Sequence, residues 1–132
     1  MKRISLLILF PIVWMLSCQS DREKFSVDTT VEVDNVYDFG EVMQGEKVKA
    51  RFEIKNTGDV DLKIFEVKPS CGCTLADYTE EPIAPGKMGW IEAEVDTKDI
   101  VGTTTKTVTL MANTQPTAIP LTIKGKVLSK EF

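Results

Sequence analysis

Two cysteines separated by a single glycine, Cys71 and Cys73 in the stretch PSCGCT, are the residues whose type and spacing most directly suggest chemistry. Paired thiols can form a disulfide, exchange electrons or bind a soft metal ion. The chain contains no histidine, so it lacks the usual general base and the commonest metal ligand. This absence disfavours most hydrolases, transferases and zinc sites. We therefore expect neither catalytic residues nor a cofactor.

Four interpretations of this cysteine pair are open. In a local disulfide, Cys71 and Cys73 would lie roughly 6.6 Å apart in an extended chain, near the upper limit of about 6.8 Å for disulfides, and Gly72 could bend the chain. So small a loop would make a weak and easily reduced staple. Because such a bond would be easily reduced, the pair could instead be redox-active. Lys68 and Lys87 are the only cations near it by sequence that could lower a thiol pKa. The last two interpretations are Cu(I) ligation and a pair of free, buried thiols.

The first seventeen residues have the pattern of a secretory signal. Lys2 and Arg3 precede an apolar run at 4–16. This run contains Pro11 and is shorter than the ~20 residues that a membrane-spanning helix needs. We therefore expect a signal peptide at 1–17.

The residues after this signal suggest lipidation. Ser17 and Cys18 complete the stretch MLSC, which resembles the lipobox of bacterial lipoproteins. The resemblance implies that the thiol of Cys18 carries a lipid, with acyl chains such as palmitate, and that this cysteine becomes the mature N-terminus. The residues that follow are polar and charged, so we expect a lipidated cysteine and a polar tether at 18–28.

Lipidation at Cys18 would determine the compartment of the protein and restrict its possible partners. It would leave Cys71 and Cys73 in an oxidising compartment. Without the expected signal, 14 of the 16 basic residues remain together with 20 acidic ones, which gives a net charge of −6. With a pI of about 4.9, this charge argues against nucleic acid, since phosphate binding needs a basic surface. We expect a membrane-anchored lipoprotein of the bacterial cell envelope, on its periplasmic face or the cell surface, with an unidentified protein partner.

From residue 29 onward the pattern is that of β-strands. In KVKARFEIKN, at 47–56, apolar and charged residues alternate strictly, as in a strand with one buried face. The inward positions of this and later stretches are Val48, Ala50, Phe52, Ile54, Ile91, Ala93, Val95, Val108, Leu110, Ala112, Ile119, Leu121, Ile123 and Val127. Parallel strands would need helical crossovers, and no helical period separates these stretches. The sequence predicts one all-β domain at 29–132, an antiparallel β-sandwich.

About seven strands are predicted, and three features indicate irregularities in or between them. The strands are TTVEVD, DFGEV, KVKARFEIKN, LKIFEVK, WIEAEVD, KTVTLMA and AIPLTIKGKV. Pro120 cannot donate to a ladder, so it marks an edge, a bulge or an outward position without a partner. In LKIFEVK the apolar phase changes after Ile64, which a bulge or burial on both faces would explain. APGK places Pro85 and Gly86 at the centre of a type II turn.

The order of these motifs resembles a known family. DFGEV is followed by NTGD, PSCGCT, PIAPGK and a final LTIKGKV, and in this order, over 37–127, they are similar to the DUF1573 family of bacterial envelope proteins. The resemblance implies an immunoglobulin-like fold, similar to ASPM/SPD-2/Hydin and major-sperm-protein-like domains, and an envelope location. It supplies no catalytic residues.

These expectations combine into one functional hypothesis and one alternative. We expect a non-enzymatic, lipid-anchored envelope protein that binds or scaffolds a partner through loops or a sheet edge, because open sandwich edges are common sites of strand addition. The alternative is an envelope thiol-redox or Cu(I)-handling lipoprotein that works through Cys71 and Cys73.

Overall fold

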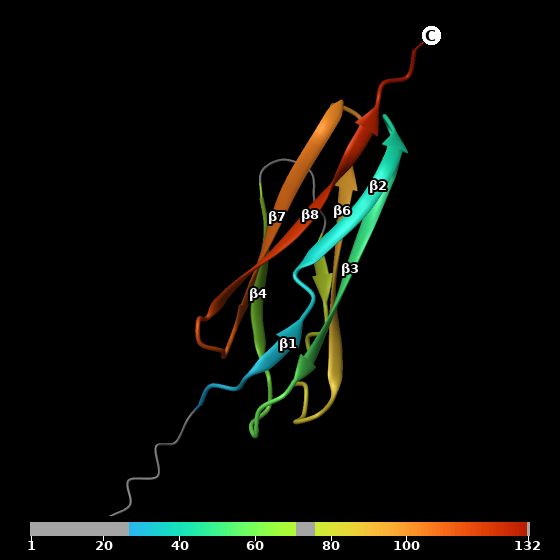
Figure 1. Cartoon of the computed structure of the whole chain (residues 1–132). Coiled ribbons are helices and arrows are strands. Elements are labelled where there is room, and N and C mark those ends of the chain that lie inside the picture. The colour runs from blue at the N-terminus through green and yellow to red at the C-terminus, as the bar shows by residue number, and fades with distance from the viewer. Residues whose placement is uncertain (1–26, 71–75, 132) are drawn as a thin grey trace, which may run out of the picture.

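The computed structural model describes residues 27–70 and 76–131, which form two four-stranded sheets packed face to face (Figure 1). The strands are β1 (Val31–Val33), β2 (Val36–Met43), β3 (Lys47–Asn56), β4 (Ile64–Pro69), β5 (Ala76–Tyr78), β6 (Met88–Asp96), β7 (Gly102–Ala112) and β8 (Ala118–Leu128). One sheet has the order β1-β3-β6-β5 and the other β2-β8-β7-β4. Apart from β2, this is the arrangement of an immunoglobulin constant-type sandwich. The predicted all-β, immunoglobulin-like fold is confirmed.

One strand pair differs from the predicted antiparallel pattern. β2 and β8 run parallel, from Val36 beside Thr122 to Met43 beside Leu128. Parallel neighbours need a long connection, and here the whole chain from β3 to β7 supplies it. The described residues also contain an eighth strand, because the short β5 pairs antiparallel with β6 in a stretch where no strand was predicted.

The alternation predicted for β3 is confirmed. Its apolar residues are all buried, and so are their counterparts in β6. On the outer face, basic residues of β3 meet carboxylates of β6: Lys47 Nζ lies 3.1 Å from Glu94 Oε1. The guanidinium of Arg51 lies 4.0 Å from a Glu92 carboxylate oxygen and 4.8 Å from the ring centre of Trp90. Opposite charges on facing strands favour this register.

Pro120 occupies an outward, exposed position in β8, a central strand of its sheet. On one side it faces Thr109 of β7. On the other side β2 begins to pair only near Thr122, whose N–H donates to the Asn35 carbonyl at 2.7 Å. Because residues two apart direct their main-chain groups to the same side of a strand, the nitrogen of Pro120 faces a stretch that β2 does not cover. Of the three predicted alternatives, the outward position without a partner is the observed one.

The other two predicted irregularities are also present. The register between β4 and β7 shifts between Ile64 and Glu66, and the extra residue, Phe65, is 58% exposed. The turn in APGK is closed by the Lys87 N–H, which donates to the Ala84 carbonyl at 3.0 Å. Gly86 has a φ of 78°, as a type II turn requires at its third position.

Candidate functional site

The site residues predicted from the sequence, Cys18, Cys71 and Cys73, lie outside the described residues. The lipidation of Cys18 therefore stays a prediction. The disulfide, redox, copper and free-thiol interpretations of the pair stay hypotheses as well.

The chain on either side of 71–75 belongs to edge strands of opposite sheets. Ser70, directly after β4, is fixed on β7: its N–H donates to the Thr107 carbonyl at 2.7 Å, and its Oγ accepts from the Thr107 N–H at 3.1 Å. Ala76 begins β5 and lies beside Ala93 of β6. Residues 71–75 therefore follow the edge strand of one sheet, β4, and precede the edge strand of the other, β5.

The described part of the chain offers surface features rather than a metal or membrane-spanning site. Within 27–70 and 76–131, no three or more histidine, cysteine, aspartate or glutamate side chains gather closely enough to hold a metal ion. In the same ranges, no helix has the length and apolar character needed to cross a membrane. A groove at one end of the sandwich is the candidate site.

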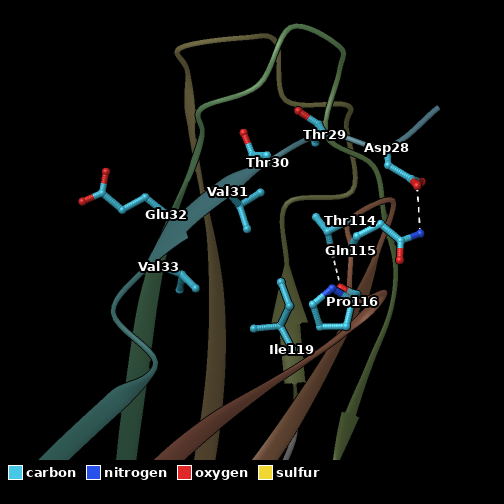
Figure 2. A pocket seen from close by; sticks show the side chains of 10 residues that line it. All are labelled: Asp28, Thr29, Thr30, Val31, Glu32, Val33, Thr114, Gln115, Pro116 and Ile119. Atoms are coloured by element: carbon cyan, nitrogen blue, oxygen red, sulfur yellow. Dashed lines mark hydrogen bonds between the residues drawn. The ribbon is translucent and has the colours of Figure 1, made fainter. Parts of the chain in front are cut away.

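This groove runs between β1 and the hairpin that joins β7 to β8 (Figure 2). It has a volume of ≈ 910 Å³ and is lined by residues 28–33, 114–116 and 119. Val31, Val33 and Ile119 point into it and pack against the core, each partly buried. Glu32 points away from it. The groove therefore has an apolar floor and a polar rim.

The groove exists because the start of the domain changes sheets. β1 pairs with β3 in one sheet, and β2 then pairs with β8 in the other. One end of the groove is closed where Thr29 forms a bridge with Thr114, and the other where Asn35 accepts the N–H of Thr122. Between these ends, no described strand pairs with β1 or with residues 118–121 of β8 on the groove side.

The main-chain groups of β1 alternate between β3 and the open edge. The N–H of Thr57 donates to the Thr30 carbonyl at 2.9 Å, so the groups of Thr30 and Glu32 point toward β3. The groups of Val31 and Val33 consequently point away from β3. They present N–H donors and C=O acceptors at the spacing that an added strand requires.

The sequence matches, over residues 30–127, the family described as Protein of unknown function (DUF1573). The chain belongs to the DUF1573 family. The resemblance carried by NTGD and PSCGCT is therefore confirmed. No curated protein matches the sequence.

The fold of the DUF1573 domain is similar to that of several solved structures. A protein of unknown function from Porphyromonas gingivalis W83 is 21% identical over 76% of this chain, with a TM-score of 0.68, and the chain spans about half (48%) of that protein. The ASH/PapD-like domain 7 of human CEP192 is 12% identical over 79% of this chain and 89% of its own length, with a TM-score of 0.60. The secreted serine protease VesC from Vibrio cholerae is 12% identical over 75% of this chain and 23% of its own, with a TM-score of 0.58. At these identities the similarity shows a shared PapD-like sandwich fold.

In the DUF1573 domain, Asn56 of the NTGD motif holds β1 in place. Its side chain is fully buried. The Oδ1 atom accepts from Thr29 Oγ1 at 2.7 Å and from the Gly58 N–H at 3.1 Å. The Nδ2 atom donates to the Val60 carbonyl at 2.7 Å and to the Ile83 carbonyl at 2.8 Å. The sequence did not reveal this role, because two of the partners lie 27 residues away.

A second buried asparagine fixes the chain where it enters the domain. Asn113 Nδ2 donates to the Val27 carbonyl at 2.8 Å and to the Asp61 carbonyl at 3.0 Å. Its Oδ1 accepts from the Lys63 N–H at 2.6 Å, and its own carbonyl accepts from the Thr29 N–H at 2.8 Å. Together the two amides position β1, and with it the groove, against the loops at this end of the DUF1573 domain.

The charge around the groove of the DUF1573 domain is acidic. Asp28 and Glu32 are among the lining residues, and Asp34 follows directly after β1. No lysine or arginine occurs among the lining residues. The open edge therefore combines main-chain hydrogen-bonding groups, an apolar floor and a negative rim.

Proposed function

We propose that this protein is a non-enzymatic, lipid-anchored module of the bacterial cell envelope, which binds an extended segment of a partner protein at the edge of β1. The observation that carries the proposal is the open edge of β1, where Val31 and Val33 direct main-chain groups outward beside an apolar groove. An added strand gains hydrogen bonds from such an edge and side-chain contacts from the groove. The similarity to PapD-like domains supports a binding domain only at the level of its fold.

The expected anchor supports a partner close to the membrane. Nine residue steps separate Cys18 from Val27, and a chain of that length spans at most about 32 Å. Val27 is bound by Asn113 at the end of the sandwich that carries the groove. The C-terminus lies at the opposite end (Figure 1). A lipid on Cys18 would therefore keep the groove near the membrane surface.

Site-specific photo-crosslinking in the native envelope tests the binding proposal. The photoreactive amino acid p-benzoylphenylalanine is placed at Glu32 of β1 or, as a matched control, at Glu66 of the outer strand β4. Both positions are exposed glutamates on short outer strands. We expect a discrete protein adduct from position 32 only, mapping to an extended segment of the partner. Adducts of equal yield from both positions, or from neither, would contradict recognition at β1.

Replacement of the lipidated cysteine tests the anchor separately. Cys18→Ser removes the thiol that would carry the lipid, so we expect this variant to move from the membrane fraction to the soluble fraction. Cys71→Ser is the matched control and should stay in the membrane fraction. Retention of the Cys18→Ser variant on membranes would show that the protein is held there by something other than this lipid.

A second candidate function, thiol-redox or Cu(I) handling through Cys71 and Cys73, is favoured by one described residue. Lys106 lies on the core-facing phase of β7 and is half-buried. It is the chain neighbour of Thr107, to which Ser70 is hydrogen-bonded. A cation near a cysteine favours the thiolate. The sequence did not indicate this lysine, because strand pairing brings β7 beside the end of β4.

Thiol exchange with glutathione and copper binding by the full chain distinguish the two functions. The binding-module proposal expects slow exchange and no stoichiometric copper. Rapid exchange that Cys73→Ser abolishes and Lys106→Gln slows would support the redox function instead. Lys124→Gln, at an exposed position of β8, is the matched control for loss of charge.

A further inference from the structure

We propose that the segment recognised at β1 is a strand in which a lysine or arginine is flanked on both sides by aliphatic, preferably β-branched, residues. This inference rests on the proposed function, since it names the chemistry of the partner at the same edge. It follows from three properties of the groove: the direction of its main-chain groups, its floor and its charge.

The main chain allows strand addition on β1 but not on the facing part of β8. Val31 and Val33 of β1 direct their main-chain groups to the open edge, as described above. On β8, the outward group between Ala118 and Thr122 belongs to Pro120, which has no N–H to donate. An incoming strand therefore extends the sheet of β1, β3, β6 and β5.

The position of the groove sets the pattern of the incoming strand. Successive side chains of a strand alternate between its two faces. On the inner face, alternate residues of the incoming strand meet Val31, Val33 and Ile119, which line the groove and are only partly buried. Burial of aliphatic side chains there removes apolar surface of both partners from water. The residues that face inward should therefore be apolar.

The outer face selects a basic residue between these apolar ones. Glu32 points away from the groove (Figure 2) and is exposed. It lies opposite Lys55 of β3, but no ion pair within 4.0 Å joins it to any described residue. An outward residue of the added strand would lie next to Glu32, with Asp34 following along β1. A lysine or arginine is favoured there, and a like charge is disfavoured.

Binding of three short peptides to the full chain in detergent micelles tests this inference. The peptides are Val-Lys-Val-Lys-Val, Val-Glu-Val-Glu-Val and the shuffled Val-Val-Val-Lys-Lys, each with a fluorescent label, and anisotropy measures their affinity. We expect the alternating lysine peptide to bind roughly three- to tenfold more tightly than the glutamate peptide. The shuffled peptide should bind more weakly than the alternating lysine peptide, although it has the same net charge and composition.

Charge reversal on the protein makes the test specific to one position. Glu32→Lys should invert the preference, so that the glutamate peptide binds more tightly than the lysine peptide. Glu66→Lys, on β4, makes the same change of charge at the other outer strand and should leave the preference unchanged. An equal response to both substitutions would indicate attraction by net charge and would overturn the inference.

The remaining outcomes separate this inference from the proposed function. Equal binding of both alternating peptides, weakened for both by Val31→Pro, would overturn the basic partner and leave strand addition at β1 intact. Equal binding of the shuffled and alternating lysine peptides would overturn the alternating pattern. Concentration-dependent self-association that Val31→Pro removes would identify a second copy of this chain as the occupant and overturn a basic partner strand. No binding of any peptide, together with no adduct from position 32, would overturn both proposals.

Discussion

β1 and β4 are both outer strands, but only β4 combines a bulge, an ion pair and a proline at its exposed edge. β4 has a bulge at Phe65, an ion pair of 3.2 Å between Glu66 and Lys68, and a proline, Pro69, at its end. Bulges, charges and prolines all hinder the addition of another strand. The three residues of β1 include one charge and neither a bulge nor a proline. The comparison indicates that the edge of β4 is closed to partners and that of β1 is open.

The two strands also differ in what holds them. β4 is held by main-chain pairing with β7 from Ile64 to Pro69, interrupted only at Phe65. β1 pairs with β3 at three positions only and depends on Asn56, Asn113 and the space left by Gly58. A Cβ atom at Gly58 would lie 2.7 Å from the Thr30 nitrogen and would also collide with the Thr29 hydroxyl. An open edge thus coincides with a strand whose position depends on a few residues at a strand end and in loops.

Loss of the Asn56 amide should produce the largest effect and should act on β1 first. We expect Asn56→Ala to lower the free energy of unfolding by about 3 kcal/mol, since it removes the partners of several buried polar groups. Urea unfolding followed by Trp90 fluorescence measures this, because Trp90 is the only tryptophan after residue 17. Asn35→Ala, at an exposed position, is the control and should change the free energy by less than about 0.5 kcal/mol. A small effect of Asn56→Ala would mean that β1 is held by its pairing with β3 alone.

A methyl group at Gly58 should displace β1 and leave β4 in place. Gly58→Ala forces a side chain against the Thr29 hydroxyl and the Thr30 nitrogen. We expect a loss of about 2 kcal/mol in the free energy of unfolding, as for other overpacked sites. Relative to the unsubstituted protein, hydrogen exchange should accelerate more for the Glu32 amide of β1, which faces β3, than for the amides of β4. Uniform acceleration in both strands would contradict a separate dependence of β1 on this glycine.

The sequence predicts the strands whose two faces differ and misses the pairings between distant segments. β3 and β6 alternate along their length, β7 over 108–112 and β8 over 119–127, because one face of each packs on the core there. β5 has three residues, too few for a period, and its pairing with β6 depends on the tertiary fold. The parallel pairing of β2 with β8 joins the two ends of the domain, which no local pattern encodes.

The candidate site was less predictable than the fold, for a related reason. The groove arises where the chain leaves one sheet for the other at Asp34 and Asn35, two residues that favour turns. The Asp-Asn pair between Val33 and Val36 is the sequence feature from which the change of sheets could have been predicted. The roles of Asn56 and Asn113 depend on partners far along the chain, which no local motif encodes. The chemistry of Cys71 and Cys73 stays a prediction.

Proline substitutions at adjacent positions of β1 sharpen the assignment of its open side. The Glu32 N–H faces β3, whereas the Val31 N–H faces the groove side. Glu32→Pro should therefore lower the free energy of unfolding by about 1 kcal/mol more than Val31→Pro, which loses no hydrogen bond to β3. Urea unfolding of the two variants in parallel measures the difference. The reverse order would mean that β1 presents the opposite set of groups to partners.

The smallest effect is expected for Phe65, the aromatic residue of β4. Phe65 is 58% exposed at the bulge, and an exposed aromatic side chain is a common anchor in protein interfaces. If the bulge and the charges close this edge, Phe65→Ser should change the free energy of unfolding by less than about 0.5 kcal/mol and leave the adduct from position 32 at full yield. Urea unfolding and the crosslinking assay measure the two quantities on the same variant. Loss of the adduct with stability unchanged would show that the binding surface extends to β4. The bulge and charges of β4 would then make that edge selective for one partner instead of closing it to all partners.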